Sequence, residues 1–172
     1  RTPMNGIIGF SQMLMRPSLT KQKMDYYSQI IVDNSKQLLT IVNDILDISL
    51  IEAGQMKLIM EHVDVNRLLD SLYSLFEPQV KLLQIDFNIS KDDSDVNSVI
   101  YTDATRLRQI LSNLLNNALK FTKQGSIEFG YKVEPSFLKF FVFDTGVGIA
   151  SELLEEVFER FRQEELEDSR KM

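Results

Sequence analysis

Three polar side chains recur at helical spacing in the middle of the chain. Asn113, Asn117 and Lys120 occupy positions i, i+4 and i+7 of segment 104–121, and residues at that spacing share one face of a helix. Asparagine is a poor helix former, so local propensity does not explain its presence there. An amide oxygen suits Mg²⁺, which takes phosphate oxygens and waters as further ligands, and the Lys120 ammonium can meet a phosphate. The face is therefore either a phosphate and metal site or a merely solvated surface, which is the commoner case.

A second group with chemical potential is the loop 144–149, which follows the apolar run 140–143. Asp144 ends a predicted strand, and its carboxylate can accept a hydrogen bond from an exocyclic amine. Gly146 and Gly148 allow a tight turn and a close approach of the backbone to a ligand. An ordinary Asp-Gly turn has the same residues. The dinucleotide-binding fingerprint is excluded, because it needs a third glycine in a strand-to-helix turn.

The elements that carry these two groups mix strands, helices and hairpins. Periodicity predicts strands at 56–60, 85–89, 99–101, 126–133 and 137–143, helices at 65–83 and 104–121, a polar turn at 91–97 and a further helix at 151–161. The predicted core faces of the two long helices are Leu68, Leu69, Leu72, Leu75, Phe76 and Val80, and Leu107, Ile110, Leu111, Leu114 and Ala118. This mixture predicts an α+β fold with helices on one face of a mainly antiparallel sheet.

The first third of the chain has a different pattern, which predicts a helical hairpin. Helices are expected at 3–15 and 20–53, with Thr20 as the N-cap of the second helix and a domain boundary near Gly54. Apolar residues of the second helix form two rows with a period of seven, Met24, Ile31, Leu38, Ile45 and Tyr27, Ile41, Ile48, and Asn34 is the polar member of the second row. An amphipathic helix packed on its own domain is the commoner explanation. Two helices bury little core, however, so the seam favours a dimeric four-helix bundle.

Composition limits the classes of function. The 172 residues carry 19 basic and 25 acidic side chains, a net charge of -6, which makes nucleic acid an unexpected partner. Cysteine is absent, so disulfides and thiolate metal sites are excluded and a reducing compartment is expected. No apolar run approaches the roughly 20 residues of a membrane helix. The start at Arg1 and the end at Met172 predict a piece of a longer protein.

The helix and the glycine loop, in this order, resemble the N box and first glycine box of sensor histidine kinases. Residues 1–5 resemble the part of the H box that follows the phospho-accepting histidine, 43–54 look like the end of the dimerisation hairpin, and 157–161 look like the F box. The resemblance covers nearly the whole chain. It implies a dimerisation and phosphotransfer hairpin at 1–54, followed at 55–172 by an α/β sandwich ATP-binding domain of the histidine kinase and Hsp90 type.

The resemblance also implies a role for each matching residue. Asn117 would bind Mg²⁺, with Asn113 beside the triphosphate and Lys120 on a phosphate. Asp144 would bind the adenine amine. The other residues expected around the nucleotide are Phe121 at its border, Gly146 and Gly148 in the adenine pocket, and Phe158 and Phe161 as anchors of a mobile lid. The latter pair can equally be explained by simple helix packing.

The implied reaction moves the ATP γ-phosphoryl group to a histidine nitrogen and then to an aspartate of a response-regulator receiver. The acceptor histidine is expected three residues before Arg1, and the second glycine box after the F box, so both lie outside the sequence. The piece alone is therefore expected to lack autokinase activity. Thr2 is a candidate in phosphatase chemistry or simply a helix-start threonine, and the lone His62 is expected to be structural or at the surface.

Two alternatives share the ATP pocket. One is a nucleotide-binding dimer scaffold without enzymatic activity. The other is a non-kinase ATPase of the same superfamily, which the hairpin and its seven-residue seam disfavour. For a kinase, the resemblance implies a homodimer with a cytoplasmic core and a parent protein anchored in the bacterial inner membrane.

Overall fold

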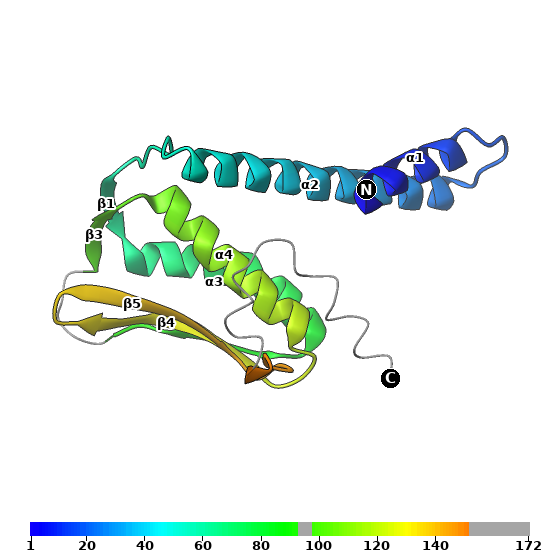
Figure 1. The fold of residues 1–172 in the computed structure, drawn as a ribbon. Helices are drawn as coiled ribbons and strands as arrows, with labels where there is room; N and C mark the ends of the chain where they lie inside the picture. The colour runs from blue at the N-terminus through cyan, green and yellow to red at the C-terminus, as the bar shows by residue number, and fades with distance from the viewer. Residues whose placement is uncertain (93–97, 152–172) are drawn as a thin grey trace. The chain divides into compact units, whose positions relative to one another are not determined.

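The computed structural model describes residues 1–92 and 98–151 of a chain that divides into two compact units (Figure 1). The first unit, Arg1–Lys57, is a helical hairpin. The second unit, Leu58–Met172, contains every strand of the described part of the chain. The fold is therefore the predicted hairpin followed by an α+β unit.

The hairpin consists of α1 (Thr2–Leu14) and α2 (Lys21–Glu52), which pack against each other. The Thr20 side chain caps α2 by accepting a hydrogen bond of 3.4 Å from the Lys23 N–H. Gly54 follows α2 with a φ of +63°, and its N–H bonds the Ile51 carbonyl, which is the usual way for glycine to close a helix. Both predicted helices are confirmed.

The apolar seam of α2 is not covered within one chain. None of the 32 residues of α2 is buried, and Met24 and Ile45 of the seven-residue rows are 47% and 49% exposed. Asn34 is half-buried, and its amide lies so close to Gly6 of α1 that a Cβ at that glycine would meet it at 2.8 Å. The hairpin therefore has a contact between its own helices but no closed core.

The second unit combines two helices with two small sheets. Its elements are β1 (Glu61–Asp64), α3 (Val65–Leu83), β2 (Asp86–Ser90), β3 (Val99–Thr102), α4 (Ala104–Phe121), β4 (Ser126–Glu134) and β5 (Phe137–Asp144). β1 pairs with β3 antiparallel, and the three-stranded sheet has the order β2-β4-β5. β4 and β5 form an antiparallel hairpin, whereas β2 and β4 run parallel, because β3 and α4 cross over between them.

The core lies between the two helices and the three-stranded sheet, which α3 and α4 cover on one face (Figure 1). Leu69 and Leu72 of α3, Leu111 and Leu115 of α4 and Phe129 of β4 are at most 1% exposed. The Phe87 ring stacks on Phe129 and on Tyr73 at centroid distances of 5.3 and 4.9 Å. Apolar burial of this kind is the main source of stability in a domain of this size.

The strand expected at 56–60 is wrong. Residues 55–60 are irregular, and the strand begins at Glu61, where pairing with Thr102 of β3 starts. Leu58, Ile59 and Met60 are 57%, 75% and 42% exposed, so their apolar character does not reflect burial on a sheet. The position of a short strand depends on its partner, and the sequence pattern alone does not contain that partner.

The expected core faces of the helices are partly wrong. Leu75 of α3 is 56% exposed, and Ile110 and Leu114 of α4 are 58% and 44% exposed. Leu115, which the predicted stripe omits, is buried together with Leu111 and Ala118. The adjacent apolar pairs Ile110–Leu111 and Leu114–Leu115 permit two positions of the stripe, and packing on the sheet selects the one centred on Leu111, Leu115 and Ala118.

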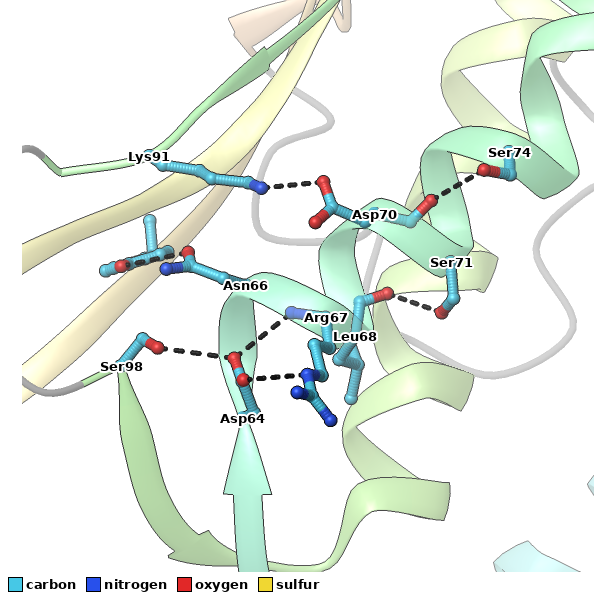
Figure 2. A network of polar contacts seen from close by, with 10 residues as sticks. Asp64, Asn66, Arg67, Leu68, Asp70, Ser71, Ser74, Lys91 and Ser98 are labelled. Atoms are coloured by element: carbon cyan, nitrogen blue, oxygen red, sulfur yellow. Dashed lines mark hydrogen bonds and ion pairs between the residues drawn. The ribbon is translucent and has the colours of Figure 1, made fainter.

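A polar network holds the start of α3 (Figure 2). The Asp64 carboxylate accepts hydrogen bonds from the Arg67 N–H at 3.1 Å and from the Ser98 hydroxyl at 3.2 Å. These bonds lower the pKa of Asp64, with the Arg67 amide as the largest cause. Farther along α3, Asp70 forms an ion pair of 2.6 Å with Lys91. Asp64 is thus a conventional N-cap.

Candidate functional site

The polar face of α4 is exposed, as the spacing predicts. Asn113, Asn117 and Lys120 are all exposed, while Leu111, Leu115 and Ala118 form the buried face of the same helix. At the end of the helix the Lys120 ammonium lies 5.0 Å from the centre of the Phe121 ring, which is itself 39% exposed. Two amides, an ammonium and an aromatic ring are therefore available to a ligand along this helix.

The loop after β5 is built around the Asp144 carboxylate. The Gly146 N–H donates a hydrogen bond of 2.9 Å to Asp144 Oδ1, and the buried Thr122 hydroxyl makes a long one of 3.5 Å to the same atom. Among the described residues, no hydrogen bond reaches Oδ2 of this half-buried side chain. One carboxylate oxygen thus orients the group, and the other remains available as an acceptor.

The glycine loop is docked on the C-terminal end of α4. A Cβ at Gly146 would lie 2.6 Å from the Phe121 carbonyl oxygen, so only glycine fits this approach without a shift of the backbone. The next residue, Val147, donates its N–H to the same carbonyl at 3.4 Å. Gly148 adopts a φ of +67°, the left-handed region that glycine occupies without strain. The structure therefore brings Phe121, Asp144 and Gly146 together.

Thr145 fastens the other side of the loop to the start of β4. Its hydroxyl accepts a hydrogen bond of 2.9 Å from the Ser126 N–H, and its own N–H donates to the Ser126 carbonyl at 3.1 Å. Gly125, with a φ of +109°, has no room for a Cβ against the Thr145 hydroxyl. The loop is consequently held on two sides before any ligand is present.

Sequence reasoning missed Thr122, which follows the polar helix directly. Only 2% of this residue is exposed, and its hydroxyl is the one that reaches Asp144 across 22 positions of the chain. A threonine just after a helix is common in any sequence. The only available signal is its position immediately after Lys120 and Phe121, both of which the sequence assigns to the site.

The remaining candidates lie apart from this group or outside the described residues. Thr2 is exposed in the first turn of α1. His62 is exposed on β1, and its ring lies 5.2 Å from that of Tyr101. Phe158 and Phe161, and the helix expected at 151–161, lie outside the described residues. A cavity of about 250 Å³ between α3 and β2 is lined by Tyr73, Glu77, Val80, Lys81, Ile85, Asp86, Phe87 and Asn88, none of them a candidate.

Two further properties of the described residues bear on cofactors and membranes. No cluster of three or more His, Cys, Asp or Glu side chains that could hold a metal ion is found among them. None of their helices has the length and apolar content needed to cross a membrane.

Family models match both units. Residues 102–172 match the histidine kinase-, DNA gyrase B-, and HSP90-like ATPase. The α4 face and the Asp144 loop both fall within this segment. Residues 1–54 match the His Kinase A (phospho-acceptor) domain. The first match defines a class of ATP-binding domains, and the second restricts that class to the histidine kinases.

Individual relatives agree with these models. The chain is 38% identical over 170 residues to hybrid signal transduction histidine kinase L of Dictyostelium discoideum, covering 96% of this chain and 10% of that protein. It is 36% identical over 170 residues to sensor protein GacS of Pseudomonas syringae pv. syringae, covering 95% of this chain and 18% of the relative. The chain thus spans less than a fifth of the length of either of these two curated relatives.

A solved structure supports the same assignment. Histidine kinase ThkA, in a complex with response regulator protein TrrA, superimposes with a TM-score of 0.70 and 28% identity over 94% of this chain and 47% of that one. The chain belongs to the sensor histidine kinases of two-component systems, and it contains segments of their phospho-acceptor and ATPase domains.

Proposed function

We propose that this chain is the nucleotide-binding and dimerising core of an ATP-dependent histidine kinase, with adenine bound at Asp144 and the phosphates along α4. The observation that carries the proposal is the docking of the Gly146 loop on the Phe121 carbonyl. It joins a carboxylate suited to an adenine amine to the end of a helix whose exposed face is polar. From Asn113 to Phe121 that face extends about 12 Å along the helix, at about 1.5 Å per residue.

Asp144 is suited to recognise adenine. The exocyclic amine of adenine is a donor, and a carboxylate is an acceptor on both of its oxygens. The Gly146 N–H and the Thr122 hydroxyl fix Oδ1, so Oδ2 is oriented without further cost on binding. Gly146 and Gly148 keep the backbone of the loop free of side chains where the base would approach.

Asn117, Asn113 and Lys120 are suited to the charged end of the nucleotide. Asn117 offers an amide oxygen to Mg²⁺, and Lys120 offers an ammonium to a phosphate oxygen. When bound, Mg²⁺ neutralises charge on the phosphates and so favours transfer of a phosphoryl group. Phe121, next to Lys120, gives the nucleotide an apolar border.

In the proposed reaction a histidine nitrogen attacks the γ-phosphorus of ATP. The N–P bond forms, the bond to the β,γ-bridging oxygen breaks, and ADP leaves; the phosphoryl group then moves to a response-regulator aspartate. His62 is an unsuitable acceptor, because it lies on β1 with its ring against Tyr101. We therefore propose that the 172 residues alone do not autophosphorylate, and that the acceptor belongs to the parent protein.

Two protein partners are part of the proposal. A second copy of the chain would cover the seam of α2, where Met24 and Ile45 are about half exposed. A response-regulator receiver is the second partner, and support comes from the solved ThkA complex, in which the related kinase binds response regulator protein TrrA. Thr2, exposed near the start of α1, would face the phosphotransfer chemistry and is a candidate for phosphatase activity.

Nucleotide titration tests the site. Calorimetric titration of the chain with ADP should show binding that strengthens with Mg²⁺. Asn117→Ala should remove most of the Mg²⁺-dependent gain, and Asp144→Ala should abolish binding. Asn116→Ala is the matched control, because it removes an exposed amide from the adjacent position of the same helix. Equal effects of the Asn116 and Asn117 changes would contradict the metal assignment.

Incubation with γ-labelled ATP separates kinase chemistry from simple nucleotide binding. The 172-residue chain should bind nucleotide and acquire no label. A longer chain that includes the residues before Arg1 should acquire an acid-labile label. Stable phosphohistidine at His62 would overturn the proposal, and a longer chain that binds ATP without being labelled would favour a nucleotide-binding scaffold.

A further inference from the structure

The buried carboxylate of Asp103 connects two segments that lie far apart in the sequence. One oxygen, Oδ1, accepts a hydrogen bond of 3.0 Å from the Arg106 N–H and so caps α4. The other, Oδ2, accepts a bond of 2.9 Å from the Ile59 N–H. Asp103 is only 6% exposed, which is unusual for a carboxylate without such partners. Each oxygen therefore serves a different segment.

The bond to Ile59 replaces a missing strand partner. β1 and β3 pair from Asp64 with Val99 to Glu61 with Thr102. Beyond this last pair β3 ends, and the chain continues into α4. The N–H of Ile59 consequently has no strand opposite it. The Asp103 side chain supplies the acceptor, and because it also caps α4 it fixes both segments at the point where they diverge.

Ile59 belongs to the connector, defined here as residues 55–60, which joins α2 of the hairpin to β1. The boundary between the two compact units lies within it, after Lys57. Leu58, Ile59 and Met60 are exposed, so burial of their side chains does not hold this segment. A backbone hydrogen bond to a buried charge is a stronger tie than one to a neutral acceptor.

We propose that Asp103 is a positioning residue that ties the connector, by which the chain enters the second unit, to the start of α4, the helix that carries the proposed nucleotide-binding face. This inference rests on the proposed function for its nucleotide part only. α4 is a continuous helix, and Asn117 lies about 21 Å along it from Asp103 at about 1.5 Å per residue. A displacement of the connector would act on α4 as a whole.

Asp64 provides a matched contrast within the same unit. It caps α3 as Asp103 caps α4, and both carboxyls have a pKa below the ordinary value, because backbone N–H groups stabilise the ionised form. The second partner of Asp64 is the Ser98 hydroxyl at the start of β3, as Figure 2 shows, whereas that of Asp103 is the connector. Replacing both by serine removes a charge from each cap, but only one of the changes touches the connector.

Amide hydrogen exchange of the full chain, read by NMR, tests the tie. Serine is a good N-cap with a single short acceptor, so Asp103→Ser should speed exchange at Ile59 about tenfold or more and leave Arg106 within about threefold of wild type. Asp64→Ser should leave Ile59 unchanged. An unprotected Ile59 amide in the wild type, or equal exchange in wild type and Asp103→Ser, would overturn the proposal, as would loss of protection at Arg106 alone.

Asp103→Asn is the second variant, for use if the serine variant does not fold. An asparagine has one acceptor oxygen, so only Ile59 or Arg106 can keep its bond. Protection retained at both amides would overturn the proposal. Loss at one of the two would support it, because it shows that the two oxygens of Asp103 serve both segments.

Mg·ADP tests the link to the nucleotide face. Binding energies are reciprocal, so saturating Mg·ADP should slow exchange at Ile59 in the wild type and in Asp64→Ser but not in Asp103→Ser. Binding without any effect on Ile59 would refute the positioning role. Absence of Mg·ADP binding in the wild type would instead refute the proposed nucleotide site. The exchange rates of the Ile59 amide in wild type and Asp103→Ser, measured without nucleotide, would still decide whether Asp103 holds the connector.

Discussion

The two units of the chain differ in how they complete their cores. α3 has 19 residues and buries Val65, Leu68, Leu69, Leu72, Phe76 and Val80 against the sheet and α4. α2 has 32 residues and buries none. The second unit, which is the ATPase unit, therefore obtains its stability from contacts within one chain. The hairpin closes no core within one chain, and the proposed second copy would supply part of its stability. Changes in the two units should consequently differ in their dependence on protein concentration.

The largest effect is expected from a substitution that creates a new cavity in the core of the ATPase unit. Leu72→Ala removes a fully buried side chain from α3 and should lower the free energy of unfolding by about 2–5 kcal/mol. Urea denaturation should show the same loss at every protein concentration. Leu75→Ala, three residues away but 56% exposed, should cost under about 1 kcal/mol. A loss that depended on concentration would contradict a core completed within one chain.

A charge in the hairpin seam should act mainly on association. Ile45→Asp is expected to raise the dissociation constant of the dimer about 100-fold, because a carboxylate would be buried at the interface. Analytical ultracentrifugation measures this constant. Lys36→Ala, an exposed change on the same helix, should leave it unchanged. An Ile45→Asp chain that stays dimeric at low concentration would show that the seam of α2 is not the dimer interface.

A methyl group on the docked loop should affect nucleotide binding. Gly146→Ala places a Cβ 2.6 Å from the Phe121 carbonyl, so the loop must move away from α4. We expect about a tenfold weaker affinity for ADP, roughly 1.4 kcal/mol. Val147→Ala shortens an exposed neighbour and should change the affinity less than about twofold. Undiminished ADP binding by Gly146→Ala would show that docking of the loop on α4 is not needed for nucleotide binding.

Acid should weaken the ATPase unit through its two capping carboxylates. Hydrogen bonds from the Arg67 and Arg106 amides lower the pKa of Asp64 and Asp103, respectively, below the unfolded value of about 3.9. Their stabilisation is therefore complete above that unfolded value and is lost as the pH falls through the folded values. Thermal melts below about pH 5 should show a shallower pH dependence for Asp103→Ser. Parallel melting curves would contradict this contribution.

The smallest effect is expected at two glycines of α1. Gly9 has open space around it, so Gly9→Ala should stabilise the hairpin by about 0.5–1 kcal/mol through helix propensity. Gly6→Ala should gain less, because its Cβ meets the Asn34 amide at 2.8 Å. Thermal melting at a fixed concentration compares the two. A larger gain at Gly6 would mean that Asn34 does not restrict the approach of the helices.

Local patterns predicted the helices and the exposed face of α4, because helical spacing alone places Asn113, Asn117 and Lys120 together. They did not predict features that depend on a distant partner. The exposure of Leu114 and the burial of Leu115 are decided by the sheet, and the start of β1 by β3. Thr122 joined the site only through its contact with Asp144, and Asp103 gained its second role only through Ile59.

The central claim is that the Asp144 loop and the exposed face of α4 form one nucleotide site. Titration of the isotopically labelled chain with Mg·ADP, followed by NMR, tests it most directly. We predict saturable shifts that are largest in the amides of 117–122 and 144–148. Shifts centred instead on the cavity between α3 and β2, at Tyr73, Lys81 and Asn88, would contradict the claim.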